Sequence, residues 1–505
     1  MKVVRNIVSC LLVVSVLASL TACGKSTPNA KAGSEAKGPV TLSILIGGDN
    51  TPPSTSNVLK QITKETDIAI TPMYVPNADY STKLNTLVAS KSLPDIFYTS
   101  DPTNAVQFKQ NGAIADLTEL VPKYMTGYYP DAKDVLSKNP LNTDGKIYAV
   151  FSLMVDYAAN MNIRTDWLKN VGLSMPTDLD SLYNVLDAFT NKDPDKDGKK
   201  DTFGLSASII VGWENFSTIF GAYGVPSGKP IIADDGTVTT FMKAPNYLEA
   251  VKYFRKLYEN GLVDPDFATV PAMTSYGKLW NGQCGAIDFR CVGPTNNWMP
   301  SRYTEKVTPT FDFATVKGPD GGAGLPIQYP DYLKSVMVSS QCKNPDAAAR
   351  LLDFFYSEKG DELLRLGVEG LHFKWTDKEN GQYEMIKPYD DDATNRNDGV
   401  FVYWQPHLIT PVDNAEVRTF NKQTQEGVAL ASKNSTIPWA YIYTPFEASK
   451  TYGANLSQIE KEVFCTLITT KGDVEAEYKK GVARWDDEGG KTWEKEATEA
   501  YKSQQ

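Results

Sequence analysis

Runs of apolar residues alternate with amphipathic segments over the first part of the chain. Val40–Ile46, Ile68–Tyr74 and Leu93–Tyr98 are rich in β-branched and aromatic residues, which is typical of strands. Asn57–Thr66 and Tyr80–Ser90 lie between them and have the apolar spacing of helices. This order of strands and helices predicts a parallel sheet with helices on its faces.

A parallel sheet also predicts where a ligand binds. Ligands of open α/β sheets lie beyond the carboxyl ends of the strands. In this chain the segments that follow two such ends are Gly47–Asn50 and Tyr98–Thr103. We therefore expect ligand contacts from four polar residues, which are Asp49, Asn50, Ser100 and Asp101.

The rest of the chain continues the mixture of helices and strands. Asp144–Val150 has the character of a hairpin with Asp-Gly at its turn. Asn162–Leu168 leads into a helix, and a further helix opens at Pro176-Thr177 with an apolar face formed by Leu182, Val185, Leu186 and Phe189. The remaining expected helices are 247–260, 345–356, 458–469 and 473–485, and the remaining expected strands are 284–289 and 335–339.

This order of elements predicts an α/β protein with two lobes. Residues 40–175 form the first part of the N-terminal lobe, and residues 176–333 form the C-terminal lobe. Residues 334–505 return across the hinge and complete both lobes with closing helices. A hinge made of several chain segments suits closure of the lobes around a ligand.

The N-terminus has the features of an export signal. Lys2 and Arg5 precede an apolar run, Ile7–Leu20, that is too short for a permanent membrane span. Leu20–Gly24 matches a bacterial lipobox, so residues 1–22 are expected to be removed and Cys23 to carry a diacylglyceryl group. The alternative is an ordinary signal peptide followed by an unrelated cysteine. Residues 23–39 are small and polar and predict a flexible tether.

Charge and hydropathy limit the partners of the exported protein. Without residues 1–22 the chain has 49 basic and 61 acidic side chains, a net charge of −12. Such an acidic surface has no electrostatic attraction for nucleic acid or for anionic lipid. The later sequence contains no apolar run long enough to span a bilayer. The lipid at Cys23 is therefore expected to hold a monomer on the extracellular face of the membrane.

Histidine is too scarce for several kinds of catalysis. His372 and His407 are the only histidines, which argues against Ser-His-Asp, Cys-His and multi-histidine metal sites. A carboxylate pair for glycoside cleavage remains conceivable, although no local signature marks one. Cys284 and Cys291 allow either a disulfide or buried free thiols.

An acidic loop, Asp193–Asp201, has the spacing of a calcium site. Its oxygen-bearing residues match positions 1, 3, 5 and 9 of an EF-hand loop, with glycine at position 6 and a backbone carbonyl at position 7. The glutamate of position 12 is absent, and Thr202 could offer an oxygen instead. A solvated acidic turn is the alternative. The expected ligands of a structural Ca²⁺ are Asp193, Asp195, Asp197, Lys199 through its carbonyl, Asp201 and Thr202.

Aromatic residues gather in turn-rich stretches near the expected strand ends. Indole and phenol rings can stack on the apolar face of a sugar, while carboxylate and guanidinium groups bind its hydroxyls. The alternative for each ring is a place in the core or on the surface. Together with the four polar residues above, the expected ligand contacts are Trp213, Glu214, Arg290, Trp298, Tyr329 and Trp404.

Several segments, taken in order, resemble a known family. They include Leu93–Ile96, Gly145–Tyr148, Asn162–Leu168, the acidic loop with Phe203–Leu205, Leu257–Phe267, Cys342–Ala348 and Gly367–Gly370. With the lipobox, they resemble the extracellular solute-binding lipoproteins of carbohydrate ABC transporters, near the lipoprotein A and alginate-oligosaccharide-binding branch.

The resemblance implies a periplasmic-binding-protein-like fold of type II, with the sugar held between two hinged lobes. It also implies delivery of an oligosaccharide to ABC permease subunits, and calcium in a loop like this one. Thr202 departs from the acidic residue that is frequent in the family. Two other functions stay open, which are a surface glycoside hydrolase or lyase and a binding protein for peptides or another non-sugar solute.

Overall fold

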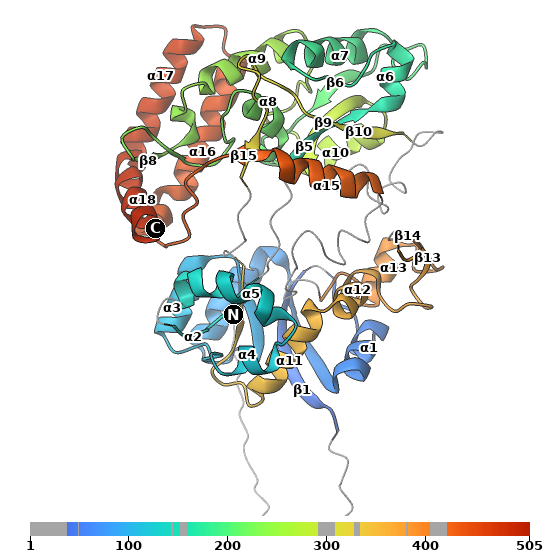
Figure 1. Ribbon diagram of the computed structural model, residues 1–505, viewed down its shortest axis with the longest axis vertical. Helices are drawn as coiled ribbons and strands as arrows, with labels where there is room; N and C mark the ends of the chain where they lie inside the picture. Colours follow the sequence, from blue (N-terminus) through green and yellow to red (C-terminus); the bar gives the residue numbers. More distant parts are fainter. Residues whose placement is uncertain are drawn as a thin grey trace, which may run out of the picture. The chain divides into compact units, whose positions relative to one another are not determined.

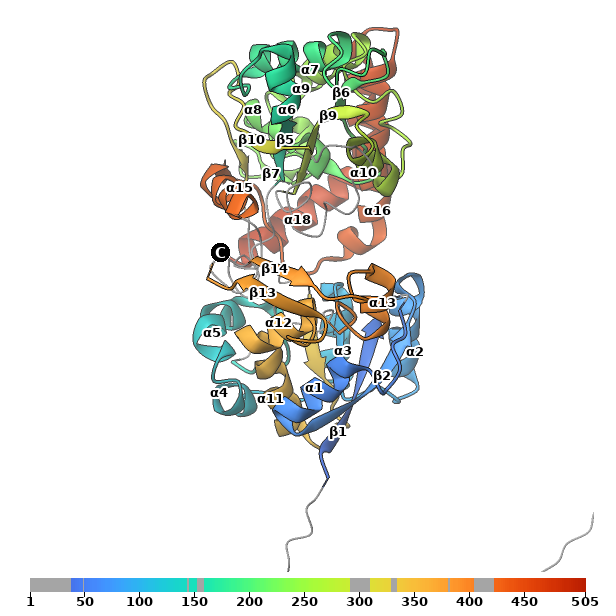
Figure 2. The ribbon, with the colours of Figure 1, turned by 90° about the vertical axis from the view of Figure 1, so that its right-hand side faces the viewer.

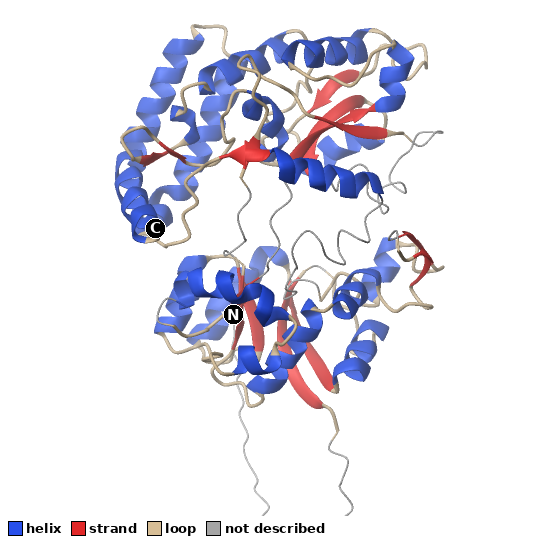
Figure 3. Ribbon diagram, in the orientation of Figure 1, coloured by secondary structure: helices blue, strands red, loops and turns tan. Residues whose placement is uncertain are grey.

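A computed structural model of the chain describes residues 38–48, 50–142, 145–151, 159–290, 309–327, 334–379, 382–403 and 422–505. The chain divides into Met1–Gly38 and Pro39–Gln505, and only the second unit is described below. This unit contains two large hydrophobic cores. Each core surrounds its own sheet, and the two sheets with their helices can be followed in Figures 1, 2 and 3. Five expected functional residues lie outside the described residues, and these are Cys23, Asp49, Trp298, Tyr329 and Trp404.

The first lobe comprises residues 39–151 and 334–403 and surrounds a five-stranded sheet of order β2-β1-β3-β12-β4. β1 is parallel to β2 and β3, whereas β12 is antiparallel to β3 and β4. The expected parallel βαβ start is therefore confirmed. The strands are β1 (Val40–Gly47), β2 (Ile68–Val75), β3 (Ile96–Thr99), β4 (Val150–Phe151), β12 (Ser335–Val338), β13 (Phe373–Asp377) and β14 (Gln382–Met385), and the α-helices are α1 (Asn57–Thr66), α2 (Tyr80–Ala89), α3 (Pro102–Gln110), α4 (Leu120–Tyr124), α5 (Tyr128–Lys138), α11 (Pro345–Tyr356), α12 (Glu358–Leu366) and α13 (Asp392–Asn397).

Local chemistry explains the limits of the first helix. Ser56 caps α1, because its hydroxyl accepts a hydrogen bond from the Leu59 N–H at 3.3 Å. Asp67 ends the helix in the left-handed conformation, with φ of 56°. Val58, Leu59 and Ile62 face the core. The observed bounds of α1 are those that the sequence predicts.

The second lobe comprises residues 159–327 and 422–505 and surrounds a four-stranded sheet of order β10-β5-β9-β6. β5 is antiparallel to both β10 and β9, and β9 is parallel to β6. The strands are β5 (Ala159–Arg164), β6 (Phe203–Ser206), β7 (Ile231–Ile232), β8 (Val238–Thr239), β9 (Cys284–Arg290), β10 (Phe311–Ala314), β11 (Leu325–Pro326) and β15 (Ser435–Ile437), and the α-helices are α6 (Thr165–Val171), α7 (Leu179–Asn191), α8 (Ser217–Ala222), α9 (Tyr247–Glu259), α10 (Ala272–Trp280), α15 (Lys422–Asn434), α16 (Glu447–Thr469), α17 (Val474–Trp485) and α18 (Lys491–Ser503).

The chain passes three times from one lobe to the other, through residues 152–158, 328–333 and 404–421. These segments lie outside the described residues. The first crossing falls before the boundary expected at residue 175. Met161, Ile163 and Trp167 already belong to the second core, so β5 and α6 are part of the second lobe.

One expected local element is wrong. Asp144 lies outside the described residues, and residues 145–149 contain no strand of the expected hairpin, since β4 begins only at Val150 and pairs with β12. Polar side chains bind the backbone before it: the Ile147 N–H donates to Thr118 Oγ1 and the Tyr148 N–H donates to Asn142 Oδ1, both at 3.0 Å. Side-chain acceptors thus replace the partner strand that a hairpin would have supplied.

The disulfide alternative for Cys284 is also wrong. Cys284 is a free, fully buried thiol, and burial raises its pKa to about 12. β9 extends from Cys284 to Arg290, a span of roughly 20 Å. The Cα atoms of a disulfide lie within about 7 Å of each other. Cys291, the other cysteine of the expected pair, is outside the described residues.

Candidate functional site

Several strands of the first sheet end along the same edge of that sheet. β1, β3 and β4 run in the same direction, so Gly47, Thr99 and Phe151 end their strands at this edge. Ser335 begins the antiparallel β12 there, because it pairs with both Thr99 and Phe151. The segments that carry the expected polar ligand contacts therefore leave from one edge, as the sequence predicts for carboxyl ends.

The expected residues at this edge differ in their local roles. Asn50 is half-buried, and Ser100 and Asp101 are exposed. Asp101 caps α3: its backbone carbonyl accepts from the Ala105 N–H at 3.1 Å, and its Oδ1 accepts from the Asn104 N–H at 3.4 Å. Asn50 and Ser100 thus remain the clearer candidates for ligand contact.

The structure adds an aromatic pair behind this edge. The rings of Tyr80 and Tyr98 stack at 4.5 Å, and the Tyr80 hydroxyl donates to the Tyr98 carbonyl oxygen at 3.0 Å. Burial raises the pKa of Tyr98 to about 12, so its hydroxyl stays protonated. A Cβ at Gly47 would lie 2.4 Å from the Tyr98 hydroxyl, which explains a glycine at the end of β1. The place of Tyr98 near the end of an expected strand is the only signal that could have indicated it.

The second sheet has a buried carboxylate near the carboxyl end of β9, one of its two inner strands. Asp288 on β9 is fully buried, and it accepts hydrogen bonds from the Thr218 N–H at 2.6 Å and from the Thr218 hydroxyl at 3.0 Å. Burial raises the pKa of Asp288 to about 7. Asn215 joins the same cluster, because its Nδ2 donates to the Asp288 carbonyl oxygen at 2.7 Å. The cluster fixes the segment after β6 onto β9.

The expected ligand residues of the second lobe lie on the two segments that this cluster joins. Trp213 and Glu214 directly precede Asn215, and Arg290 follows Asp288 on β9. The half-buried Trp213 packs against Phe216, Phe220, Phe241 and Phe464, with 4.7 Å between its ring centre and that of Phe241. These contacts give Trp213 a structural role in the second core. Glu214 is half-buried, and its charge contributes to the raised pKa of Asp288. Arg290 ends β9, paired with Ala159.

The acidic loop after α7 brings three carboxylates together. Each of the three residues Asp193, Asp195 and Asp197 has one carboxylate oxygen that lies within 4.8 Å of the corresponding oxygens of the other two. Asp193 and Lys196 have positive φ angles of 49° and 59°, and Gly198 has one of 80°. The loop is also tied to its own carboxylates, since the Asp197 N–H donates to Asp193 Oδ1 at 3.1 Å. Calcium binds oxygens at 2.3–2.6 Å, so this spacing fits a single Ca²⁺.

Burial and neighbouring side chains shift the pKa values of two acidic residues in this loop. Partial burial and the neighbouring Asp193 raise the pKa of Asp195. Lys199 pairs with Asp197 and lowers the pKa of that carboxyl. Thr202 is buried, and its hydroxyl donates to the Phe189 carbonyl oxygen of α7 at 2.8 Å. That hydrogen bond gives Thr202 a structural role besides the metal contact expected of it, while Asp201 is exposed.

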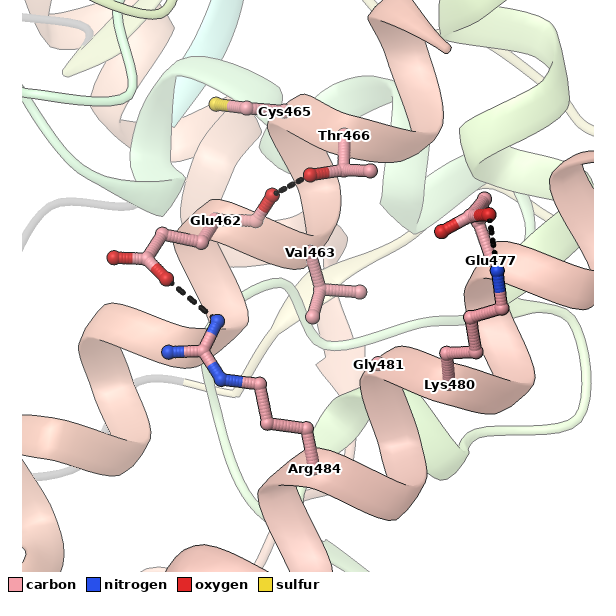
Figure 4. A pocket seen from close by; sticks show the side chains of 8 residues that line it. All are labelled: Glu462, Val463, Cys465, Thr466, Glu477, Lys480, Gly481 and Arg484. Carbon is pink, nitrogen blue, oxygen red and sulfur yellow. Dashed lines mark hydrogen bonds and ion pairs between the residues drawn. The ribbon is translucent and has the colours of Figure 1, made fainter. Parts of the chain in front are cut away.

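A surface groove of about 480 Å³ lies elsewhere, between α16 and α17 (Figure 4). Arg484 pairs with Glu462 at 2.7 Å, and Lys480 pairs with Glu477 at 2.7 Å. The charges at its rim therefore already neutralise one another. Its lining consists of Glu462, Val463, Cys465, Thr466, Glu477, Lys480, Gly481 and Arg484.

Comparison with known proteins gives a consistent result. The family model described as "Bacterial extracellular solute-binding protein" matches residues 48–362. Lipoprotein LipO of Bacillus subtilis (strain 168) is 26% identical over 506 residues, which is 96% of this chain and 96% of LipO. The polygalacturonan/rhamnogalacturonan-binding protein YtcQ of the same strain is 27% identical over 511 residues, 98% of each chain.

A solved structure shows the same fold. It is the S. pneumoniae ABC-transporter substrate-binding protein FusA, an EF-hand mutant in complex with fructo-nystose. Its TM-score is 0.68 at 20% identity, with 92% of this chain and 99% of that chain covered. At this identity the likeness concerns the fold alone, and it agrees with the expected arrangement of α/β lobes.

Proposed function

We propose, on the premise that this chain belongs to the family of bacterial extracellular solute-binding proteins, that it captures an oligosaccharide and passes it to the permease of an ABC importer. A member of this family is a substrate-binding protein rather than an enzyme, which argues against the hydrolase or lyase alternative. The observation that carries the choice of ligand is full-length similarity to YtcQ, whose name describes polysaccharide binding. The half-buried Asn50 and the exposed Ser100 supply polar groups for sugar hydroxyls.

The proposed mechanism is closure of the two lobes on the sugar. A ligand shifts a conformational equilibrium only by its differential affinity for the two states. Sugar contacts from both lobes would exist only in the closed state and would therefore favour it. The three crossings of the chain support a hinge of several segments. Small-angle scattering should show a smaller radius of gyration with the sugar bound.

Binding is tested by calorimetry on the full chain in detergent. Oligogalacturonides, rhamnogalacturonan fragments and fructo-oligosaccharides are compared with mixed peptides. We expect saturable binding of one carbohydrate class, with the sugar recovered uncleaved. Saturable binding of peptides alone would favour the non-sugar alternative, and cleavage products would favour the enzyme alternative.

A pair of variants locates the sugar. Ser100→Ala should weaken binding about fivefold, because one hydrogen bond to a hydroxyl is lost. Ser137→Ala is the matched control, since Ser137 is also exposed but its hydroxyl donates to the Asp134 carbonyl oxygen within α5. Equal affinity of the two variants would remove Ser100 from the site.

We also propose a structural Ca²⁺ in the loop of Asp193, Asp195 and Asp197. Binding to the folded state alone stabilises it, by about 2.7 kcal/mol at a hundredfold excess over Kd. Chelation should therefore lower the melting temperature, and calcium should restore it. Asp195→Ala should abolish this response, and Asp187→Ala, which removes a half-buried carboxylate on the preceding α7, should retain it. If calcium does not change the melting temperature, the loop is a solvated acidic turn and not a calcium site.

The proposed anchor is a lipid on Cys23. No helix in the described part of the chain combines the length and apolar character needed to cross a membrane. The name of LipO describes a lipoprotein, and the LipO sequence aligns with nearly the whole of this chain. Cys23→Ala should release the protein from membranes into the medium. Retention of that variant in the membrane fraction would contradict the anchor.

A further inference from the structure

Phe401 combines two unusual properties. Its side chain is 38% exposed, which makes it one of the few large apolar side chains on the described surface. Its backbone has a φ of 62°, in the left-handed region that is unfavourable for a bulky residue. Glycine would adopt this conformation without strain. Nothing about core packing requires an exposed phenylalanine at such a position.

The surrounding structure holds this residue in place. The Phe401 N–H donates to the Leu364 carbonyl oxygen at 2.8 Å. Val400 and Tyr403 on either side are buried in the first core. A strained residue persists only where its neighbours fix the backbone, and such residues concentrate at ligand sites. The fixed segment therefore presents the Phe401 ring in a defined position.

Two contacts connect this segment to β2 and to the start of α1. The Tyr403 and Tyr74 hydroxyls lie 2.7 Å apart, and the Tyr74 hydroxyl donates to the Pro52 carbonyl oxygen at 2.9 Å. Asp398 accepts from the Asn57 N–H at 2.7 Å and from its side-chain amide at 2.6 Å. Tyr74 belongs to β2 and Asn57 is the first residue of α1, and a Cβ at Gly399 would lie 3.3 Å from Ser56 Oγ. Residues 398–403 thus lie beside the start of α1, at the end of the loop that follows β1 and carries Asn50.

A cation accompanies the exposed ring. The Arg396 guanidinium carbon lies 5.6 Å from the Phe401 ring centre, and Arg396 Nε is 3.0 Å from Asp392 Oδ2. Both side chains of this ion pair remain partly exposed, at 38% for Arg396 and 64% for Asp392. A flat apolar face beside a guanidinium suits a sugar, whose ring has an apolar face and a rim of hydroxyls.

We propose that Phe401 is a sugar-stacking residue of the first lobe, with Arg396 as the neighbouring donor to the sugar's oxygens. The proposal rests on the proposed carbohydrate function and extends its site to a residue that no strand end or turn motif indicates. The occupant is one sugar ring of the bound oligosaccharide, stacked on the exposed face of the phenylalanine.

The test compares three substitutions at one position, with carbohydrate affinity and melting temperature measured on the full chain. Phe401→Ala should weaken binding about tenfold, and Phe401→Tyr should keep it within about twofold, because only the alanine removes the ring. Phe401→Gly should weaken binding as much as alanine does while raising the melting temperature, because it relieves the backbone strain. A structural role alone would not separate affinity from stability in this way.

Ile232→Ala is the matched control, since Ile232 is an exposed apolar side chain of the second lobe at 44%. It should leave affinity unchanged. If Phe401→Ala binds the sugar as tightly as the unaltered chain, the stacking role is wrong and the proposed function stands. If the unaltered chain binds no carbohydrate, the proposed function itself fails, and the role of Phe401 fails with it.

Discussion

The two sheets differ in where their polar side chains lie relative to the strands. In the first lobe, β3 and β12 are wholly buried, and apart from Thr99 and Ser335 at their ends their residues are apolar. The exposed polar residues Ser100 and Asp101 come only after the strand has ended. In the second lobe, polar side chains lie within the strands and are buried, and these are Asn160, Asn162, Arg164, Ser206 and Asp288.

The buried polar groups of the second lobe mostly bind backbone atoms. Asn160 Nδ2 donates to the Gly427 carbonyl oxygen at 2.9 Å, and Asn162 Nδ2 donates to the Asn160 carbonyl oxygen at 2.8 Å. Such bonds add little net stability, but losing one partner leaves the other group buried and unpaired. The second lobe should therefore tolerate substitution near its sheet less well than the first.

The largest expected difference concerns two glycines. A Cβ at Gly221 on α8 would lie 1.9 Å from the Gly324 carbonyl oxygen, whereas a Cβ at Gly47 would meet the end of the Tyr98 side chain. Backbone cannot move aside as a side chain can. Gly221→Ala should lower the free energy of unfolding by about 3 kcal/mol and Gly47→Ala by about 1 kcal/mol. Denaturant titration measures both.

Gly453 provides a control for the glycine pair. A Cβ there would have Ser449 Oγ as its nearest neighbour, at an ordinary 3.7 Å, in the middle of α16. Gly453→Ala should therefore stabilise the protein by about 0.5 kcal/mol through helix propensity alone. Equal losses from Gly221→Ala and Gly47→Ala would contradict the proposed contrast between the lobes.

The next effect concerns the buried carboxylate of the second sheet. Asp288→Ala leaves the Thr218 N–H without its acceptor and should cost about 2 kcal/mol. Asp288→Asn should cost much less. Its amide oxygen can accept from the Thr218 N–H, and its amide nitrogen can donate to the Thr218 hydroxyl, as a protonated carboxyl would. The two variants therefore separate the loss of a hydrogen bond from the loss of a charge.

Asp288 should also make the free energy of unfolding depend on pH, in a direction that follows from its raised pKa. The pKa of Asp288 is about 7 in the folded protein, above its ordinary value of 3.8. Between these values the folded state keeps a proton that the unfolded state has lost. The free energy of unfolding should therefore fall as pH rises from about 4 to about 7. Asp288→Asn should flatten this part of the profile, and Asp234→Asn, an exposed carboxylate of the same lobe, should not.

The contrast between the lobes also explains which elements the sequence reveals. In the first lobe, apolar strands and well-spaced helices give clear patterns, and the bounds of α1 and α11 agree with the prediction. The sequence pattern does not predict β5 of the second lobe, because its two asparagines are disfavoured in strands. Its partners lie far away in the chain: Asn160 binds residue 427, and no local pattern contains that contact.

The candidate site divides in the same way. Positions after strand ends, such as Asn50 and Ser100, follow from topology alone, and the acidic loop follows from the spacing of its residues in the sequence. Trp213 shows the limit of residue type as a signal, because an aromatic ring near a strand end serves equally well in a core. Phe401 shows the converse. Its exposure and its backbone conformation depend on contacts of its segment with Leu364 and with Tyr74 of β2, both far away in the sequence.

The smallest expected effect tests a polar contact of the first lobe. The Tyr74 hydroxyl donates to the Pro52 carbonyl oxygen, so the Tyr403 hydroxyl acts as donor to Tyr74. Tyr403→Phe removes one bond and leaves Tyr74 paired with Pro52, and should cost about 0.5 kcal/mol. Tyr74→Phe removes both bonds and should cost about 1.5 kcal/mol. If Tyr403→Phe costs as much as Asp288→Ala, polar contacts in the first lobe are as sensitive as those of the second, and the difference drawn between the two sheets does not hold.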